Sequence, residues 1–208
     1  GSRVVSPEEL DRAPYVLAKA ESGYPFGNLT AYDTALGWRF PNPRMAELYG
    51  TEPMGETAEN IADQYHISRE EQDRFAAQSH ARAVAAMEDG RMAEEILPVT
   101  VTPKKGEPIL CDRDERPRRD TTVESLAKLK PAFRQGGSVT AGNSSGMNDG
   151  AAALLLMSAE KAAELGLKPM VKIKASAAAG VAPRVMGLGP VGAAHKALQR
   201  AGLKPSDL

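Results

Sequence analysis

The stretch Gly137-Ser-Val-Thr-Ala-Gly-Asn-Ser-Ser-Gly-Met-Asn-Asp-Gly150 runs directly into the apolar segment Ala151-Ala-Ala-Leu-Leu-Leu-Met157, and the rest of the chain is organised around this pair. Glycines at positions 142, 146 and 150 permit close backbone approach, so the loop can press its amides against a ligand. The apolar run is typical of a buried strand. The pair predicts a binding loop held on a buried strand, with a solvent-exposed turn as the alternative for the loop.

Composition sets the broad class of the protein. The 208 residues, 42% of them apolar, suffice for one large domain or two small ones. Twenty-six basic and 27 acidic residues leave a net charge of −1, so charge favours neither nucleic acid nor an acidic membrane as a partner. A single cysteine, Cys111, excludes an internal disulfide framework and fits a reducing, cytoplasmic location. No apolar run approaches the roughly 20 residues of a membrane-spanning helix.

Periodicity and capping signals predict the secondary structure. The surest element is an amphipathic helix that begins at the capping box Ser68-Arg-Glu-Glu71 and ends at Gly90. Residues 3–55 are interrupted by prolines and predict loops with short helices. The remaining predicted helices are 56–66, 123–129, 158–165 and 191–201, and the predicted strands are 96–102, 151–157 and 170–176. Strands separated by helices favour an α/β fold.

One motif matches a dinucleotide-binding fingerprint only in its letters. Gly187-Leu-Gly-Pro-Val-Gly192 has the glycine spacing, but Pro190 removes an amide that a pyrophosphate would use, and no acidic residue follows at the distance of a ribose ligand. The stretch therefore predicts the start of a helix.

Candidate metal and nucleophile sites are also weak. His66, His80 and His195 share no metal-ligand spacing with Cys111 or with one another, so no metal is expected. Arginines near Cys111 could lower the pKa of its thiol, but no histidine neighbours it in sequence, and a nucleophilic role is rejected. The four arginines between positions 113 and 119 have two interpretations, a solvated charged loop or a clamp for phosphate groups.

Longer motifs resemble a known family. Ser138-Val-Thr-Ala-Gly-Asn-Ser-Ser-Gly-Met-Asn-Asp-Gly-Ala-Ala-Ala153 closely resembles a signature of the thiolases, which are acyl-CoA acyltransferases. Asp33-Thr-Ala-Leu-Gly-Trp-Arg-Phe40 is most similar to the branch that acts on 3-oxoadipyl-CoA. Further matches are Arg12-Ala-Pro-Tyr-Val-Leu17, Met54-Gly-Glu-Thr-Ala-Glu-Asn-Ile-Ala62, Ser68-Arg-Glu-Glu-Gln-Asp-Arg-Phe75, Ser125-Leu-Ala-Lys-Leu-Lys-Pro-Ala-Phe133 and Pro183-Arg-Val-Met-Gly-Leu-Gly-Pro190.

The resemblance implies a layered αβαβα fold of two similar halves, with an inserted loop domain that covers coenzyme A. It assigns residues 1–11 to a tag and leader, 12–133 to the loop domain, 134–168 to the end of the N-terminal half and 169–208 to the start of the C-terminal half. On this basis the fold is incomplete, and strands 151–157 and 170–176 are expected to have unpaired edges. The chain alone is expected to associate or to be loosely packed, and the intact enzyme to be a homo-oligomer.

The function implied by the resemblance is acyl transfer between a 3-oxoacyl-CoA and coenzyme A, by thiolysis or Claisen condensation. The family's acylated cysteine and its Asn-Glu-Ala-Phe, Gly-His-Pro and second-cysteine motifs have no counterpart here, and Cys111 matches neither catalytic cysteine. We therefore expect a thiolase fragment with no catalytic residue, inactive alone, that supplies coenzyme A-binding surface. Coenzyme A would be a substrate, with no cofactor. The alternative is a non-catalytic or degenerate coenzyme A-binding module.

Positions that match the family's coenzyme A contacts can be named one by one. They are Arg118 and Ser125 toward the nucleotide, Ala132 and Phe133 along the pantetheine, Ala141, Ser145 and Met147 beside it, and Met54 in the acyl pocket. The alternative interpretations are a salt-bridged arginine for Arg118, a helix-surface hydroxyl for Ser125, and simple core for Ala132, Phe133 and Met147. Two positions depart from the family pattern: Pro53 stands where biosynthetic thiolases have a histidine, and Arg116 where a histidine or aromatic residue is common.

Overall fold

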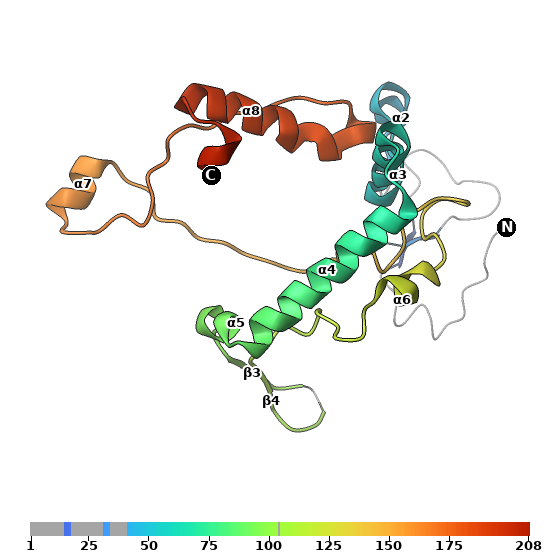
Figure 1. Ribbon diagram of the computed structural model, residues 1–208, viewed down its shortest axis with the longest axis horizontal. Coiled ribbons are helices and arrows are strands. Elements are labelled where there is room, and N and C mark those ends of the chain that lie inside the picture. The colour runs from blue at the N-terminus through green and yellow to red at the C-terminus, as the bar shows by residue number, and fades with distance from the viewer. Residues whose placement is uncertain (1–14, 18–30, 34–40, 104) are drawn as a thin grey trace. The chain divides into compact units, whose positions relative to one another are not determined.

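The structure is a computed structural model that describes residues 15–17, 31–33, 41–103 and 105–208 (Figure 1). It divides into two compact units, one formed by Ile61–Met147 and the other by Gly1–Asn60 with Asn148–Leu208. Arg12 and residues 34–40, which were quoted for their resemblance to the family, lie outside the described residues. The loops and short helices predicted for residues 3–55 are therefore tested only in part.

The unit Ile61–Met147 is built on one long helix. It contains α4 (Arg69–Glu88), α5 (Arg91–Glu95), β3 (Val99–Val101), β4 (Ile109–Cys111) and α6 (Val123–Ala127), and it receives the end of α3 (Met54–Tyr65). Helix α6 lies beside α4 (Figure 1). Strands β3 and β4 form an antiparallel hairpin in which Val99 faces Cys111 and Val101 faces Ile109.

The predicted boundaries of the long helix are confirmed. The side chain of Ser68 accepts a hydrogen bond from the amide of Glu71, and the Glu71 carboxylate accepts one from the amide of Ser68, which completes the capping box. After Glu88 the helix ends, and Gly90 follows with φ of 84°, a left-handed conformation that glycine adopts without strain. This helix carries Arg69, Gln72 and Asp73, whose side chains contact α6 and the loop at residues 138–147.

The other unit contains mostly short elements. They are β1 (Tyr15–Leu17) paired antiparallel with β2 (Ala31–Asp33), α2 (Pro43–Tyr49), α7 (Ala159–Glu164), η1 (Pro183–Leu188), α8 (Gly189–Ala201) and η2 (Pro205–Asp207). Ser158 caps α7 by accepting from the amide of Lys161, and Gly202 ends α8 with φ of 68°. Both predicted helices are confirmed, and the stretch 187–192 is indeed a helix start.

Two predicted strands are wrong. Residues 151–157 and 170–176 form no strand, and they are exposed rather than buried: Leu155 is 83% and Met170 99% accessible. The physical reason is that strand hydrogen bonds are made between strands, and none of the described strands pairs with either run. The sheets of the described residues have two strands each, so the layered arrangement stays a prediction.

The predicted strand 96–102 forms only in part, as β3, and its partner was not predicted. The sequence places Cys111 in a charged loop, but the structure places it at the end of β4, where its thiol is exposed. Strand β4 has only three residues, of which Ile109 and Leu110 precede Cys111. So short an apolar run shows no alternation from which a strand could be predicted.

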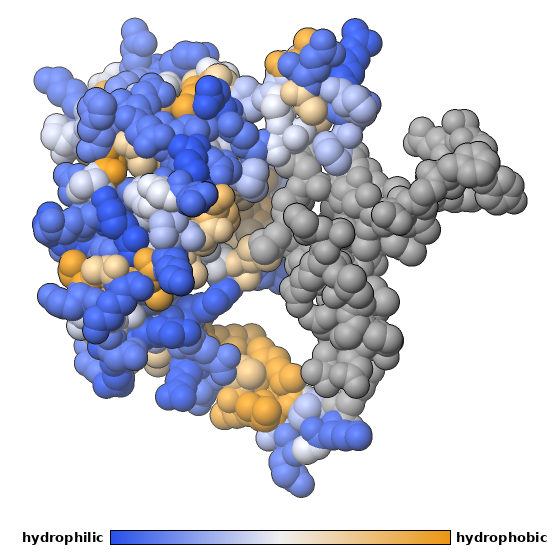
Figure 2. All heavy atoms as spheres, turned by 90° about the vertical axis from the view of Figure 1, so that its right-hand side faces the viewer, coloured by the Kyte–Doolittle hydropathy of each residue, from blue (hydrophilic) through white to orange (hydrophobic). Residues whose placement is uncertain are grey.

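Burial is sparse and often polar. In the unit Ile61–Met147 the apolar residues Ala62, Leu126 and Val139 are buried together with the polar residues Asp73 and Thr140. Figure 2 shows a largely hydrophilic face in which apolar side chains gather in patches. Within the described ranges, no helix combines the length and the apolar character that crossing a membrane requires.

Candidate functional site

The candidate site is built around the loop at residues 138–147, which the first turns of α4 hold. The capping box fixes the start of α4, and the hydrogen bond from the Ser68 amide keeps the pKa of the Glu71 carboxyl below its ordinary value. Arg69 and Asp73, one turn apart on this helix, then face the same neighbours.

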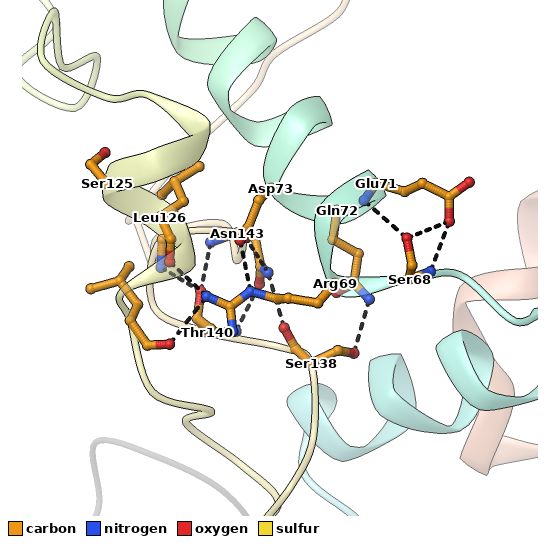
Figure 3. Close-up of polar contacts among 12 residues, drawn as sticks. Ser68, Arg69, Glu71, Gln72, Asp73, Ser125, Leu126, Ser138, Thr140 and Asn143 are labelled. Atoms are coloured by element: carbon orange, nitrogen blue, oxygen red, sulfur yellow. Dashed lines mark hydrogen bonds and ion pairs between the residues drawn. The ribbon is translucent and has the colours of Figure 1, made fainter.

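The buried carboxylate of Asp73 pairs with Arg69 on the same helix and joins α4 to the loop through Asn143 (Figure 3). The Arg69 Nε donates to Asp73 Oδ2 at 2.8 Å, and the Asn143 Nδ2 donates to Asp73 Oδ1 at 2.9 Å. The Asp73 side chain is 1% exposed. Burying a carboxylate is costly unless its oxygens are paired and hydrogen-bonded, and here each oxygen has a donor.

The same arginine also fixes the end of α6. Its Nη2 donates to the carbonyl of Leu126 at 2.6 Å and to the carbonyl of Leu129 at 3.1 Å. Carbonyls at the end of a helix lack partners within it, so a guanidinium there supplies the missing donors. Arg69 therefore ties α4 to α6.

The loop closes on itself through Thr140 and Asn143. The Thr140 Oγ1 accepts from the amides of Gly142 and Asn143, both at 3.2 Å, and Asn143 Oδ1 accepts from the Thr140 amide at 2.7 Å. Thr140 is fully buried. Gln72, next to Asp73 on α4, donates from Nε2 to Ser138 Oγ at 2.9 Å. These hydrogen bonds restrain the backbone conformation of the loop between residues 138 and 143.

Position 142 is crowded by Leu126 of α6 and by Leu129, which follows α6. A Cβ added there would lie 2.5 Å from Leu126 Cδ2 and 2.5 Å from Leu129 Cδ1, well inside contact distance. The missing side chain lets the loop and the helix approach closely. This packing brings Ser125, which is on α6, to the same region as the loop.

A bridge brings a third segment alongside. Pro131 and Thr140 pair as an antiparallel bridge, and the amide of Ala132 donates to the carbonyl of Val139 at 2.9 Å. Phe133 follows, 40% exposed, in an open hollow of about 340 Å³ that residues 130–136 line. Ala132 and Phe133 therefore lie next to the turn that carries Ala141.

The charged loop reaches the far end of the site through Arg116. Its Nη2 donates to the carbonyl of Met147 at 3.2 Å, and its guanidinium occupies the space that a side chain at Gly146 would need. Arg118 follows two residues later, and its amide donates to His80 Nδ1 at 3.1 Å. Arg116, noted from sequence only as a departure from the family pattern, thus links the arginine-rich loop to residues 146–147.

The residues predicted to contact coenzyme A differ in their hydrogen bonding and in their exposure to solvent. The Ser125 hydroxyl donates to the carbonyl of Thr122 at 2.9 Å and accepts from the Thr122 amide at 3.0 Å, so it caps its own helix. Ser145 and Ala141 are exposed, as is Met147 at 68%. Met54, 71% exposed, belongs to the other unit. Nothing in the structure tests the assigned contacts themselves, which stay predictions.

Sequence reasoning missed the residues that hold the site. Arg69 and Asp73 lie in the stretch 68–75 and Asn143 in the stretch 138–153, both quoted for their resemblance, yet no role was given to them. The available signal was an opposite-charge pair at i and i+4, which on most helices is solvent-exposed. Its burial depends on α6 and the loop, which a helix pattern does not reveal.

The described side chains form no group of three or more His, Cys, Asp or Glu residues that could hold a metal ion. His80 accepts a hydrogen bond from the Arg118 amide, and His195 is exposed on α8. The absence of a metal and of a cofactor stays a prediction.

Comparison with known proteins places this geometry in a family. A profile described as the thiolase N-terminal domain matches residues 4–160. Beta-ketoadipyl-CoA thiolase of Pseudomonas putida is 52% identical over 200 residues, which are 96% of this chain and 50% of that protein. The 3-oxoadipyl-CoA/3-oxo-5,6-dehydrosuberyl-CoA thiolase of Escherichia coli K12 is 50% identical over 201 residues, covering 97% of this chain and 50% of that protein.

Solved structures agree. The acetyl-CoA acetyltransferase of Bacillus anthracis superposes with a TM-score of 0.78 at 43% identity, covering 93% of this chain and 48% of that one. The corresponding enzyme of Syntrophomonas wolfei gives 0.74 at 41% identity, covering 94% and 47%. The chain spans about half the length of the relatives it matches.

Proposed function

The chain belongs to the thiolase family, and we propose that it supplies coenzyme A-binding surface to an enzyme that transfers acyl groups between a 3-oxoacyl-CoA and coenzyme A. Such a reaction needs a thiolate to carry the acyl group and a base to move a proton. We assign neither role to the described residues.

The observation that carries this proposal is the meeting of three segments in one compact unit. The bridge between Pro131 and Thr140 joins the segment of Phe133 to the loop. The contact of α6 with Gly142 joins Ser125 to it, and Arg116 joins the arginine-rich loop to Met147. These are the segments whose residues match the family's coenzyme A contacts, and we propose that one coenzyme A molecule contacts all three.

The positions of the arginines suggest which end of coenzyme A binds near the charged loop. Arg119 forms an ion pair with Glu88, whereas the Arg118 guanidinium has no ion pair with the described residues. A guanidinium matches phosphate oxygens through two parallel hydrogen bonds, so Arg118 is suited to the phosphates of the nucleotide. The exposed Ser145 and Ala141 then face the uncharged pantetheine.

We propose that the acyl-CoA substrate is beta-ketoadipyl-CoA, because several relatives of about 50% identity are named beta-ketoadipyl-CoA thiolase. A relative named acetyl-CoA acetyltransferase is equally similar, so the name of a relative alone does not separate these substrates. Met54, exposed at the start of α3, is the residue we propose for the acyl pocket.

We also propose that residues 151–157 and 170–176 become strands of the family's layered αβαβα core when neighbouring strands of the complete enzyme pair with them. Both runs are apolar and exposed in the structure, as unpaired core strands would be. The loop domain of the family would correspond to residues up to about 133.

Titration of the 208-residue chain with coenzyme A by calorimetry tests the proposed function, with micromolar affinity expected. Arg118→Ala should weaken binding about tenfold, the effect of losing one charge-assisted contact to phosphate. Arg119→Ala is the matched control, because that arginine is next in sequence and already paired with Glu88.

Two results would contradict the proposal. One is the absence of binding heat at coenzyme A concentrations up to the millimolar range in a chain whose circular dichroism shows the expected helices. The other is an equal loss of affinity in both arginine variants, which would indicate general attraction by positive charge rather than a contact at Arg118.

A further inference from the structure

The carboxylate of Asp73 is buried, yet it touches none of the residues that match coenzyme A contacts. Its two oxygens receive Arg69 Nε and Asn143 Nδ2. We propose that Asp73 is a positioning residue, which acts through Asn143 to hold the loop at 140–147 in the conformation that presents Ser145 to the pantetheine arm of coenzyme A. This inference rests on the proposed function.

The amide of Asn143 is the part through which Asp73 acts. Its Nδ2 donates to Asp73 Oδ1 and to the carbonyl of Ser138 at 3.1 Å, while its Oδ1 accepts from the Thr140 amide. An ionised carboxylate only accepts hydrogen bonds, so Asp73 fixes which end of the amide points toward it. Reversing the amide would place its oxygen against two other acceptors, Asp73 Oδ1 and the Ser138 carbonyl, and its NH2 group against another donor, the Thr140 amide.

The restraint reaches Ser145 over a short distance in the chain. Ser145 is two residues beyond Asn143, and Arg116 holds the other side of it at Met147. The loop is therefore fixed at both ends, on one side by a buried pair and on the other by an exposed arginine. A change at Asp73 loosens the first end and leaves the second in place.

Helix α4 offers a control of the same chemistry one position away. Glu70 and Arg74 form an ion pair at 2.7 Å with the same i, i+4 spacing, but their side chains are 72% and 63% exposed. Exposed pairs of this type contribute little, and neither side chain of this pair is hydrogen-bonded to the described residues of the loop. Glu70→Gln removes a carboxylate from α4 without touching Asn143.

The experiment compares Asp73→Asn with Glu70→Gln in the 208-residue chain, using two ligands. Coenzyme A carries both the nucleotide and the pantetheine, whereas adenosine 3′,5′-bisphosphate carries only the nucleotide. Asp73→Asn should weaken coenzyme A binding at least about tenfold and change bisphosphate binding less than about twofold. Glu70→Gln should change neither. A purely structural role would lower both affinities together.

Amide hydrogen exchange supplies a readout that needs no ligand. Asp73→Asn should accelerate exchange at the amides of Gly142 and Asn143, whose acceptor is Thr140 Oγ1, while the middle of α4 stays protected. If Asp73→Asn does not fold, Asn143→Ser replaces it, because that change lies in the loop and leaves the Arg69–Asp73 pair intact.

The outcomes separate the two proposals. If the unchanged chain binds coenzyme A and Asp73→Asn binds it equally well, the positioning role is wrong and the proposed function stands. Equal loss of affinity for both ligands, or unchanged exchange in the loop, also overturns the positioning role. If the unchanged chain binds no coenzyme A, the proposed function fails and the positioning role fails with it.

Discussion

Two stretches that almost adjoin in sequence, residues 137–147 and residues 151–176, differ in where their hydrogen bonds and apolar groups find partners. In the first, Thr140 is fully buried, its amide donates to Asn143, and its hydroxyl accepts from the amides of Gly142 and Asn143. In the second, Leu155 and Met170 are almost fully exposed, and neither apolar run pairs with a described strand.

The comparison teaches that hydrophobicity alone does not decide which stretch is ordered by its surroundings. The first stretch is rich in glycine and serine, but α4 and α6 supply donors and packing surface at the right places. The second is more apolar, but a strand needs a neighbour to satisfy its backbone, and burial requires a surface to pack against.

The largest expected difference in the free energy of unfolding is between two leucine-to-alanine substitutions, one at a residue packed on the first stretch and one within the second stretch. Leu126→Ala removes a side chain that is 4% exposed and packs on Gly142, so it should lower the free energy of unfolding by about 3 kcal/mol. Leu155→Ala, at 83% exposure, should lower it by less than about 0.5 kcal/mol. Urea unfolding followed by far-ultraviolet circular dichroism measures both, and similar losses would remove the contrast.

A smaller difference is expected for alanine at two glycines. Gly142→Ala places a methyl group against two leucines and should destabilise the unit Ile61–Met147 by about 1–3 kcal/mol. Gly150→Ala meets no atom within 4 Å, and should change stability by less than about 1 kcal/mol, toward stabilisation. Thermal unfolding of the two variants side by side measures this; a tolerated Gly142→Ala would show that α6 can move away from the loop.

The smallest effect is a pH dependence carried by a helix cap. The amide of Ser68 lowers the pKa of Glu71, and the backbone amide of Glu160, followed by the side chain of Ser158, lowers the pKa of Glu160 on α7. Because the folded-state pKa of Glu71 is depressed, its contribution is present above its ordinary pKa of 4.5 and is lost as pH falls through the lower folded value.

Glu71→Gln should therefore flatten the fall in urea midpoint of the unit Ile61–Met147 from pH 5 to pH 3. Glu160→Gln should leave that fall unchanged, because α7 belongs to the other unit. An identical pH profile for Glu71→Gln and the unchanged chain would show that the cap carries no pH dependence.

Local signals in the sequence predicted the helices well. Ser68, Thr122 and Ser158 each begin a helix where expected, and Gly202 ends one, because caps act within a few residues of themselves. Family membership was also predicted, since long motifs are specific even where their roles are unknown. For the candidate site, the sequence named the segments of the loop and of the arginines.

The sequence could not predict the contacts that hold those segments together. Arg69 and Asp73 resemble any surface ion pair, and only the packing of α6 and the loop buries Asp73. The strand β4 was missed because three apolar residues before a charged run give no usable period. The two apolar runs, residues 151–157 and 170–176, were predicted as strands because of their apolar composition, but the structure contains no strand at either run.

The sequence by itself determined where helices begin and end, which family the chain belongs to and which residues are candidates for coenzyme A contact. Only the tertiary structure decided that the Asp73 carboxylate is buried and bonded to Asn143 of the loop, that Leu126 and Leu129 crowd position 142, and that the apolar runs are exposed. The physical reason is range: capping and periodicity act within one or two turns, whereas burial, strand pairing and the partners of a buried charge depend on residues far away in the chain.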